Sequence, residues 1–201
     1  MGLAAIAAAP GDAVAHALRA RQNLSEEELV RLAASRARAL AWHDDVDHRR
    51  ELASALAALA PRRAEPARYY LESMEQTRAA LLAAPASPHD WLRLAGLGLA
   101  SSGHQARARA ASDFSTALLT GADTPGLRPG VLQVGFRLWS SLPGSAKSML
   151  LDVMRHAWRD GGTMERRGIL ALADANGLLE LALMALREEE GIEPYLGGRL
   201  S

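Results

Sequence analysis

The chain has 201 residues, enough to bury a sizeable core as one large domain or two small ones. Its 23 basic and 23 acidic side chains give a formal net charge of zero, which argues against a nucleic-acid-binding protein or a polybasic membrane-surface protein. Cysteine is absent, which excludes disulfides, cysteine-ligated metal centres and a thiol nucleophile, and leaves the redox compartment open.

The first segment, residues 1–10, contains an apolar run from Leu3 to Ala9. This run is shorter than the ~20 apolar residues of a membrane span, and no basic cluster precedes it, so it does not form a complete signal peptide. We interpret it either as the start of a frayed helix or as the remnant of a longer anchor. The second interpretation would allow association with a membrane.

Residues 11–122 are predicted to form a helical array. Alanine and leucine recur there at helical spacing, and β-branched residues are too scattered to build strands. Ser25 and Glu28 have the spacing of a capping box, which marks one strong helix start, and Pro61 and Pro85 mark two helix ends. The expected helices cover residues 12–22, 25–42, 46–60, 65–85, a stretch around Trp91, and 104–120.

The clearest break in the pattern is the sequence Gly-Ala-Asp-Thr-Pro-Gly-Leu-Arg-Pro-Gly from Gly121 to Gly130, which predicts a hinge or a long loop. A C-terminal helical subdomain is expected over residues 123–190, with helices near 131–141, 145–159, 164–175 and 178–189. Residues 191–201 lack periodicity and are expected to be a loose tail. The fold class is therefore all-α, with about eight or nine helices.

A two-helix pattern in the middle of the chain carries the most specific signal. Large and small residues alternate at helical spacing on two successive segments, separated by a glycine-marked turn at Ser102-Gly103. The first set is Trp91, Leu94, Ala95 and Gly98, and the second is Ala110, Phe114 and Ala117. Such spacing lets two antiparallel helices pack closely.

This pattern resembles the tetratricopeptide repeat, a helix pair of about 34 residues. The likeness extends from about Tyr69 to Ala122, and Pro85 stands where a preceding unit would close. The gap between the two half-motifs is about three residues longer than in that family, and no proline closes the second helix. A plain helical hairpin is the alternative. The resemblance implies antiparallel helix pairs stacked as a right-handed superhelix, with a concave groove that binds another protein or peptide.

A second, fainter likeness covers residues 108–159. This region is similar to small helical proteins of alphaproteobacteria that are often anchored in membranes and encoded beside exopolysaccharide or envelope machinery. The resemblance implies a bacterial protein that serves an envelope complex, in the cytoplasm or in association with the membrane or periplasm.

The densest group of metal-capable side chains lies between two predicted helices and comprises His43, Asp44, Asp45, Asp47 and His48. Oxygen and imidazole ligands suit a divalent cation. Acidic residues at this position also favour the N-terminus of the following helix. We favour the capping interpretation, and keep a metal-dependent enzyme based on His43 to His48 as the alternative.

Other chemical candidates give weaker signals. His89 and Asp90 are interpreted as an exposed side chain and a first-turn charge, and His156 as a surface or groove histidine, because no partnering acid is identifiable from spacing. Ser101-Ser102 and Ser140-Ser141 lack a nucleophile motif, and no glycine-rich phosphate loop is present. Glu188 to Glu190 are interpreted as a solvated helix end, with an acidic docking tail as the alternative.

Together these patterns favour a non-enzymatic protein-interaction or scaffold module, without cofactor or metal. Trp91, Arg93 and Leu97 are the residues expected near the partner groove. A helical domain that associates with itself is a further alternative. The sequence leaves the partner, the oligomeric state and the compartment open.

Overall fold

The computed structural model describes residues 3–20, 22–100, 103–121 and 123–196. The prediction of an all-α fold is confirmed: within these residues there are helices and no strands. In chain order the helices are α1 (Leu3–Ala8), a 3-10 helix (Ala9–Gly11), α2 (Asp12–Arg19), α3 (Glu26–Leu40), α4 (Val46–Leu59), a 3-10 helix (Ala60–Arg62), α5 (Pro66–Ala83), α6 (Pro88–Ala100), α7 (His104–Leu119), α8 (Arg128–Leu138), a 3-10 helix (Trp139–Ser141), α9 (Gly144–Asp160), α10 (Thr163–Ala175), α11 (Leu179–Leu186) and α12 (Glu193–Leu196).

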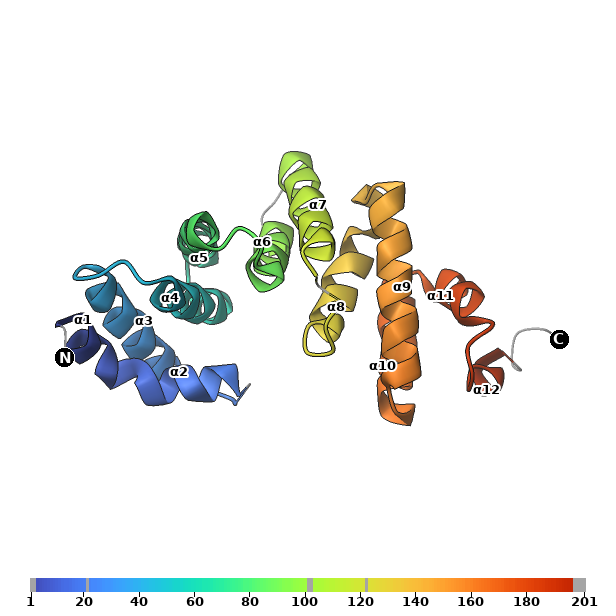
Figure 1. Cartoon of the computed structure of the whole chain (residues 1–201), viewed down its shortest axis with the longest axis horizontal. Coiled ribbons are helices and arrows are strands. Elements are labelled where there is room, and N and C mark those ends of the chain that lie inside the picture. Colours follow the sequence, from blue (N-terminus) through green and yellow to red (C-terminus); the bar gives the residue numbers. More distant parts are fainter. Residues whose placement is uncertain (1–2, 21, 101–102, 122, 197–201) are drawn as a thin grey trace.

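The helices follow one another along a single long axis, with α1 at one end and α12 at the other (Figure 1). The most extensive packing is between consecutive helices, α3 with α4, α4 with α5, and α6 with α7. The count of eight or nine helices is not confirmed: α2 to α11 correspond to the ten segments expected individually, and α1 and α12 are two further short helices among the described residues.

Helix starts follow the local signals closely. The capping box at α3 is confirmed: the Ser25 backbone N–H donates to Glu28 Oε2 at 2.7 Å, and the Glu28 backbone N–H donates to Ser25 Oγ at 3.2 Å. Helix α6 begins at Pro88, and the Asp90 backbone N–H donates to Ser87 Oγ at 3.4 Å. Each contact satisfies an amide that has no partner inside the helix.

The break predicted from Gly121 to Gly130 is shorter than expected. Helix α8 begins at Arg128, so Pro129 lies in its first turn, where a missing amide costs nothing. A Cβ on Gly130 would lie 3.4 Å from Leu92, which places this turn against α6. The loop between α7 and α8 therefore ends before the last three residues of the predicted break.

Close packing of α6 on α7 agrees with the small residues of the two-helix pattern. Leu94, Ala95, Ala110, Phe114 and Ala117 are all buried. A Cβ built on Gly98 would lie only 2.9 Å from Ala110 Cβ, so the two helices approach more closely there than an alanine pair allows. Gly103 has a φ of 112° and ends the connection between them, whereas Ser101 and Ser102 lie outside the described residues.

A continuous main core occupies the second half of the array. It contains buried side chains from Leu92 in α6 to Ile192 just before α12, and includes Phe114 and Trp158, both 0% exposed. The main core crosses the boundary predicted between residues 122 and 123, and the division into an array and a subdomain stays a prediction.

Part of the segment expected to be a loose tail packs on the main core instead. Ile192 is buried, and Tyr195 meets the Trp158 ring edge-on with the ring centroids 5.8 Å apart. The sequence gives no periodic signal for two residues that contact a distant tryptophan. Residues 197–201 lie outside the described part of the chain.

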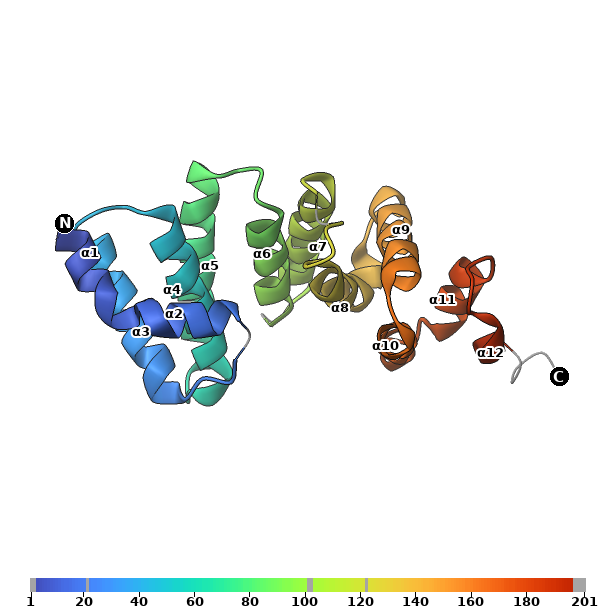
Figure 2. The same cartoon turned by 60° about the horizontal axis from the view of Figure 1, so that its bottom comes forward.

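A separate, small apolar cluster lies in the first half, and we call it the α2 cluster. Its buried members are Ala15 of α2, Leu32 of α3 and Ala55 of α4, and half-buried Val14, Leu18 and Ala33 pack against them. Helix α2 crosses α3 and α4 instead of lying alongside either of them (Figure 2).

Candidate functional site

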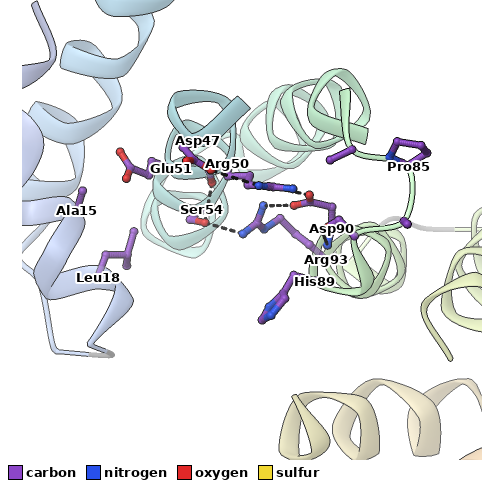
Figure 3. A pocket seen from close by; sticks show the side chains of 13 residues that line it. Ala15, Leu18, Asp47, Arg50, Glu51, Ser54, Pro85, His89, Asp90 and Arg93 are labelled. Carbon is purple, nitrogen blue, oxygen red and sulfur yellow. Dashed lines mark hydrogen bonds and ion pairs between the residues drawn. The ribbon is translucent and has the colours of Figure 1, made fainter. Parts of the chain in front are cut away.

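A groove of about 950 Å³ lies between α2, α4 and α6. We call it the α4 groove. One wall is Ala15 and Leu18 of α2, the floor comes from α4, and the opposite wall is the segment 84–87 with the first turns of α6 (Figure 3). The α4 residues on the floor are Asp47, Arg50, Glu51 and Ser54, whose spacing places them on one face of that helix.

A buried carboxylate on α6, Asp90, holds the α6 wall of the groove in place. Asp90 is 0% exposed, and it accepts hydrogen bonds from Arg50 Nε at 2.8 Å and from Arg93 Nη1 at 3.1 Å. Arg50 also contacts Asp47 at 3.2 Å. Two guanidinium groups on different helices thus share one buried acid, which ties α4 to α6 and satisfies a charge that would otherwise be costly to bury.

Arg93 completes this network by reaching back to α4. Its Nη2 donates to Ser54 Oγ at 2.9 Å, and Ser54 Oγ in turn donates to the Arg50 carbonyl oxygen at 2.8 Å. Burial lowers the pKa of the Arg93 guanidinium below its ordinary value, with the Asp90 charge opposing that effect and the Arg50 charge reinforcing it. Because the Ser54 proton is held by a carbonyl and no base receives it, the hydroxyl is not activated as a nucleophile.

On the α2 side of the groove, Glu51 is held by Arg36 of α3. Arg36 is 2% exposed and its Nε donates to Glu51 Oε2. The same guanidinium donates from Nη1 to the Ala8 carbonyl oxygen at 2.7 Å and from Nη2 to Asp12 Oδ1 at 2.8 Å. The described part of the groove therefore presents charges that already have partners, beside an apolar wall of alanine, leucine and proline.

The three residues expected near a partner groove lie in different environments. Arg93 lines the α4 groove. Trp91 is half-buried against the main core, and its Nε1 donates to the Pro85 carbonyl oxygen at 2.7 Å, in keeping with the sequence preference for a core position. Leu97 is only 6% exposed and is packed inside the array. Leu97 is buried because neighbouring helices cover its side of α6, and the sequence does not show which helices those are.

The group from His43 to His48 caps and braces α4. Asp45 is the N-cap: its Oδ1 accepts from the backbone N–H groups of Asp47 and His48, both at 2.9 Å. Asp44 contacts Arg49 at 2.5 Å. Among the residues that the structure describes, no group of three or more histidine, cysteine or acidic side chains is arranged to hold a metal ion. The hydrogen bonds to Asp45 agree with the capping interpretation.

His89 and Asp90 share a helix start but differ in burial. His89 is exposed on the rim of the α4 groove, as expected, whereas Asp90 is buried rather than a solvated first-turn charge. The partners of Asp90 come from α4, and Arg50 is 40 residues away in the sequence. A pattern read over one helix turn cannot reveal such a pairing.

His156 has an acidic partner that spacing did not reveal. Its Nδ1 lies 2.5 Å from Asp123 Oδ2, and Asp123 also accepts from Arg128 Nε at 2.7 Å. Burial alone would raise the pKa of Asp123, but the hydrogen bonds from Arg128 and His156 outweigh it and hold that pKa below its ordinary value. His156 lines a polar hollow of about 580 Å³ between α9 and the end of α11.

The acidic run after α11 serves partly as a structural contact. Helix α11 ends at Leu186, before the three glutamates, and Glu189 accepts two hydrogen bonds from Arg159, at 2.7 and 2.6 Å. Glu188 and Glu190 are exposed, as expected for a solvated helix end.

Comparisons of the chain with protein families, with curated proteins and with solved structures give no significant match. Within the described part of the chain, the helices are all too short or too polar to cross a bilayer. The geometry of the α4 groove is therefore the basis on which a function is argued.

Proposed function

We propose that the chain is a non-enzymatic protein-interaction module whose α4 groove holds a helical or extended segment of another protein. The observation that carries this proposal is the groove itself, about 950 Å³ in volume, with an apolar wall opposite charged side chains held by buried Asp90. A groove with both kinds of surface suits an amphipathic segment, because apolar burial gives affinity and fixed polar groups give orientation.

Two features of the groove favour binding over catalysis. The Ser54 hydroxyl lacks a base, and the charges of Arg50 and Arg93 are balanced by the carboxylates of Asp90 and Asp47. A catalytic site needs a reactive group left poised toward the substrate, whereas a docking surface needs groups with fixed geometry. The arrangement as a right-handed superhelix of tetratricopeptide type, and service in a bacterial envelope complex, remain part of this proposal.

A site-directed photocrosslink tests the proposal in cells that produce the protein. A photoreactive amino acid replaces His89, which is exposed on the groove rim, and in a matched control it replaces Leu119, which is 75% exposed on α7. We expect the His89 position to give an adduct with one protein, mapped by mass spectrometry to one segment, and the Leu119 position to give none. Adducts that are absent, or the same from both positions, would overturn the proposal.

The crosslinked segment then permits a direct affinity measurement. With the purified segment as probe, Arg93→Ala is expected to weaken binding about tenfold, because it removes a groove side chain. Arg187→Ala, which removes an exposed arginine after α11, is the matched control and leaves affinity unchanged. An adduct only with a second copy of the chain would instead support the self-association alternative.

A further inference from the structure

Helix α2 occupies part of the same α4 surface from which the groove is made. Ala15 packs against Leu32 of α3 and Ala55 of α4, while Ala15 and Leu18 also form one wall of the α4 groove. The path of α2 across α3 and α4 leads toward α6, as Figure 2 shows. Helix α2 therefore covers one part of the face, and the groove is the part left uncovered.

The N-terminal end of α2 is firmly held. Gly11 precedes the helix and lies so close to α3 that a Cβ there would be 2.1 Å from Ser35 Oγ. Asp12 in the first turn pairs with buried Arg36 at 2.8 Å. These contacts anchor the chain at Gly11 and Asp12, and leave the rest of α2 to be held by other means.

Among the side chains that the structure describes in α2 beyond Asp12, the packing contacts are those of the α2 cluster. Of its α2 members, only Ala15 is buried, and Val14 and Leu18 are half-buried. An alanine and two half-buried side chains remove little apolar area from water. A helix of 8 residues is also unstable without its packing. The described side chains in the C-terminal part of α2 thus contribute little attachment to a surface that continues into the groove.

From this placement we infer that the C-terminal part of α2 is an internal competitor: the partner displaces it on binding and takes the place of the wall that Ala15 and Leu18 form. The partner is an amphipathic helix that presents small and leucine side chains at the spacing of Val14, Ala15 and Leu18, because the surface under α2 is shaped to receive that set. This inference rests on the proposed function of the α4 groove. The inference specifies the kind of partner. It also predicts a lower apparent affinity, because only the molecules in which α2 is undocked can bind.

A peptide binding assay tests the competition without requiring the natural partner. The probe is a fluorescent synthetic peptide with the sequence of residues 9–20, added to the full-length chain and followed by anisotropy. Leu18→Asp loosens α2 in the chain itself, and we expect it to increase peptide affinity about tenfold or more over wild type. Leu119→Asp places the same charge on exposed α7 and leaves the affinity at the wild-type value.

A second variant locates the peptide. Ala33→Glu changes the half-buried α3 member of the α2 cluster, and in the Leu18→Asp background it is expected to abolish the gain in affinity. Circular dichroism melting confirms that each variant remains folded. Equal affinity of wild type and Leu18→Asp, or a gain that survives Ala33→Glu, would overturn the inference. If either result occurs while the His89 crosslink succeeds, α2 competition has failed but the proposed groove binding still stands.

Discussion

At the scale of single residues, buried charge determines how the α4 groove is held. Asp90 is fully buried, yet its two arginine partners are each about one quarter to one third exposed, so the cluster is open to solvent on one side. Removing one member of such a cluster leaves the others without a counter-charge.

The first prediction concerns Asp90→Asn. Loss of the carboxylate leaves Arg50 and Arg93 facing each other across a neutral amide, and we expect the free energy of unfolding to fall by about 3 kcal/mol. Urea denaturation measures this change. Asp47→Asn is the matched control, because that carboxylate is 73% exposed and pairs with the same Arg50, and it is expected to cost under about 1 kcal/mol. Equal losses for the two variants would contradict a special role for the buried acid.

A pH dependence is expected from Asp45. The His48 backbone N–H, with added effects from the His48 charge and the Asp47 backbone N–H, holds the pKa of Asp45 below its ordinary value in spite of partial burial. A carboxylate with a lowered pKa in the folded state contributes its full stability above its unfolded-state pKa, and that contribution is lost as pH falls through the folded-state pKa.

Asp45→Asn isolates this charge, because the amide oxygen can still accept the two capping hydrogen bonds. We expect wild type to be more stable than the variant above the unfolded-state pKa of Asp45, and the difference to shrink in stronger acid as pH falls through the folded-state pKa. Thermal melting of both proteins over this range provides the measurement. A difference that persists undiminished in strong acid would show that the charge does not stabilise the cap.

At the scale of elements, the close packing of α6 on α7 requires glycine at position 98 of α6 but not at position 96. Gly98 and Gly96 stand two residues apart in α6. A Cβ at position 98 would meet Ala110 Cβ at 2.9 Å, whereas at position 96 the nearest atom would be Val134 Cγ2 at an ordinary 3.7 Å. The same substitution therefore has opposite expected effects at the two sites.

Gly98→Ala is predicted to destabilise the protein by about 1–2 kcal/mol, because the strain of separating α6 from α7 exceeds the gain in helix propensity. Gly96→Ala is predicted to stabilise it by about 0.5–1 kcal/mol through propensity alone. Chemical denaturation of both variants provides the comparison. Stabilisation by both would mean that α6 and α7 can move apart without loss.

At the scale of the whole molecule, stability is distributed unevenly along the array. The main core extends from α6 to the segment before α12, while the first helices depend on pairwise contacts and the small α2 cluster. Trp158 contacts several segments at the C-terminal end. The Arg166 guanidinium lies 5.4 Å from the centroid of the Trp158 ring, and Trp158 Nε1 donates to the Glu190 carbonyl oxygen at 3.1 Å. In a linear array, each helix is stabilised mainly by its neighbours.

Trp158→Ala is accordingly expected to cost about 3–5 kcal/mol, and to act mainly on the C-terminal half. Hydrogen exchange should accelerate in α9, α10 and α11 and remain close to wild type in α3 and α4. Trp42→Ala removes a tryptophan that is 64% exposed and should change stability by less than about 0.5 kcal/mol. Uniform acceleration along the whole chain would instead indicate that the array unfolds as a single unit.

Signals carried by neighbouring residues were sufficient for the helical class and for most helix starts and ends. The Ser25 cap, the Asp45 cap and the Gly98–Ala110 packing all depend on spacing within one or two helix turns, which the sequence displays directly. The loop around Gly121 and the segment after residue 191 were less predictable, because Pro129 and Ile192 take their places from contacts with other helices.

The candidate site depended on tertiary structure. Asp90 meets Arg50 across 40 residues, and His156 meets Asp123 across 33, so no local pattern pairs them. Arg93 faces the groove while Leu97, one turn later, is buried, and that difference arises from the helices packed around α6. Periodicity and capping are short-range and are determined by the sequence, whereas burial and charge pairing depend on which distant helices meet, and only the folded chain decides that.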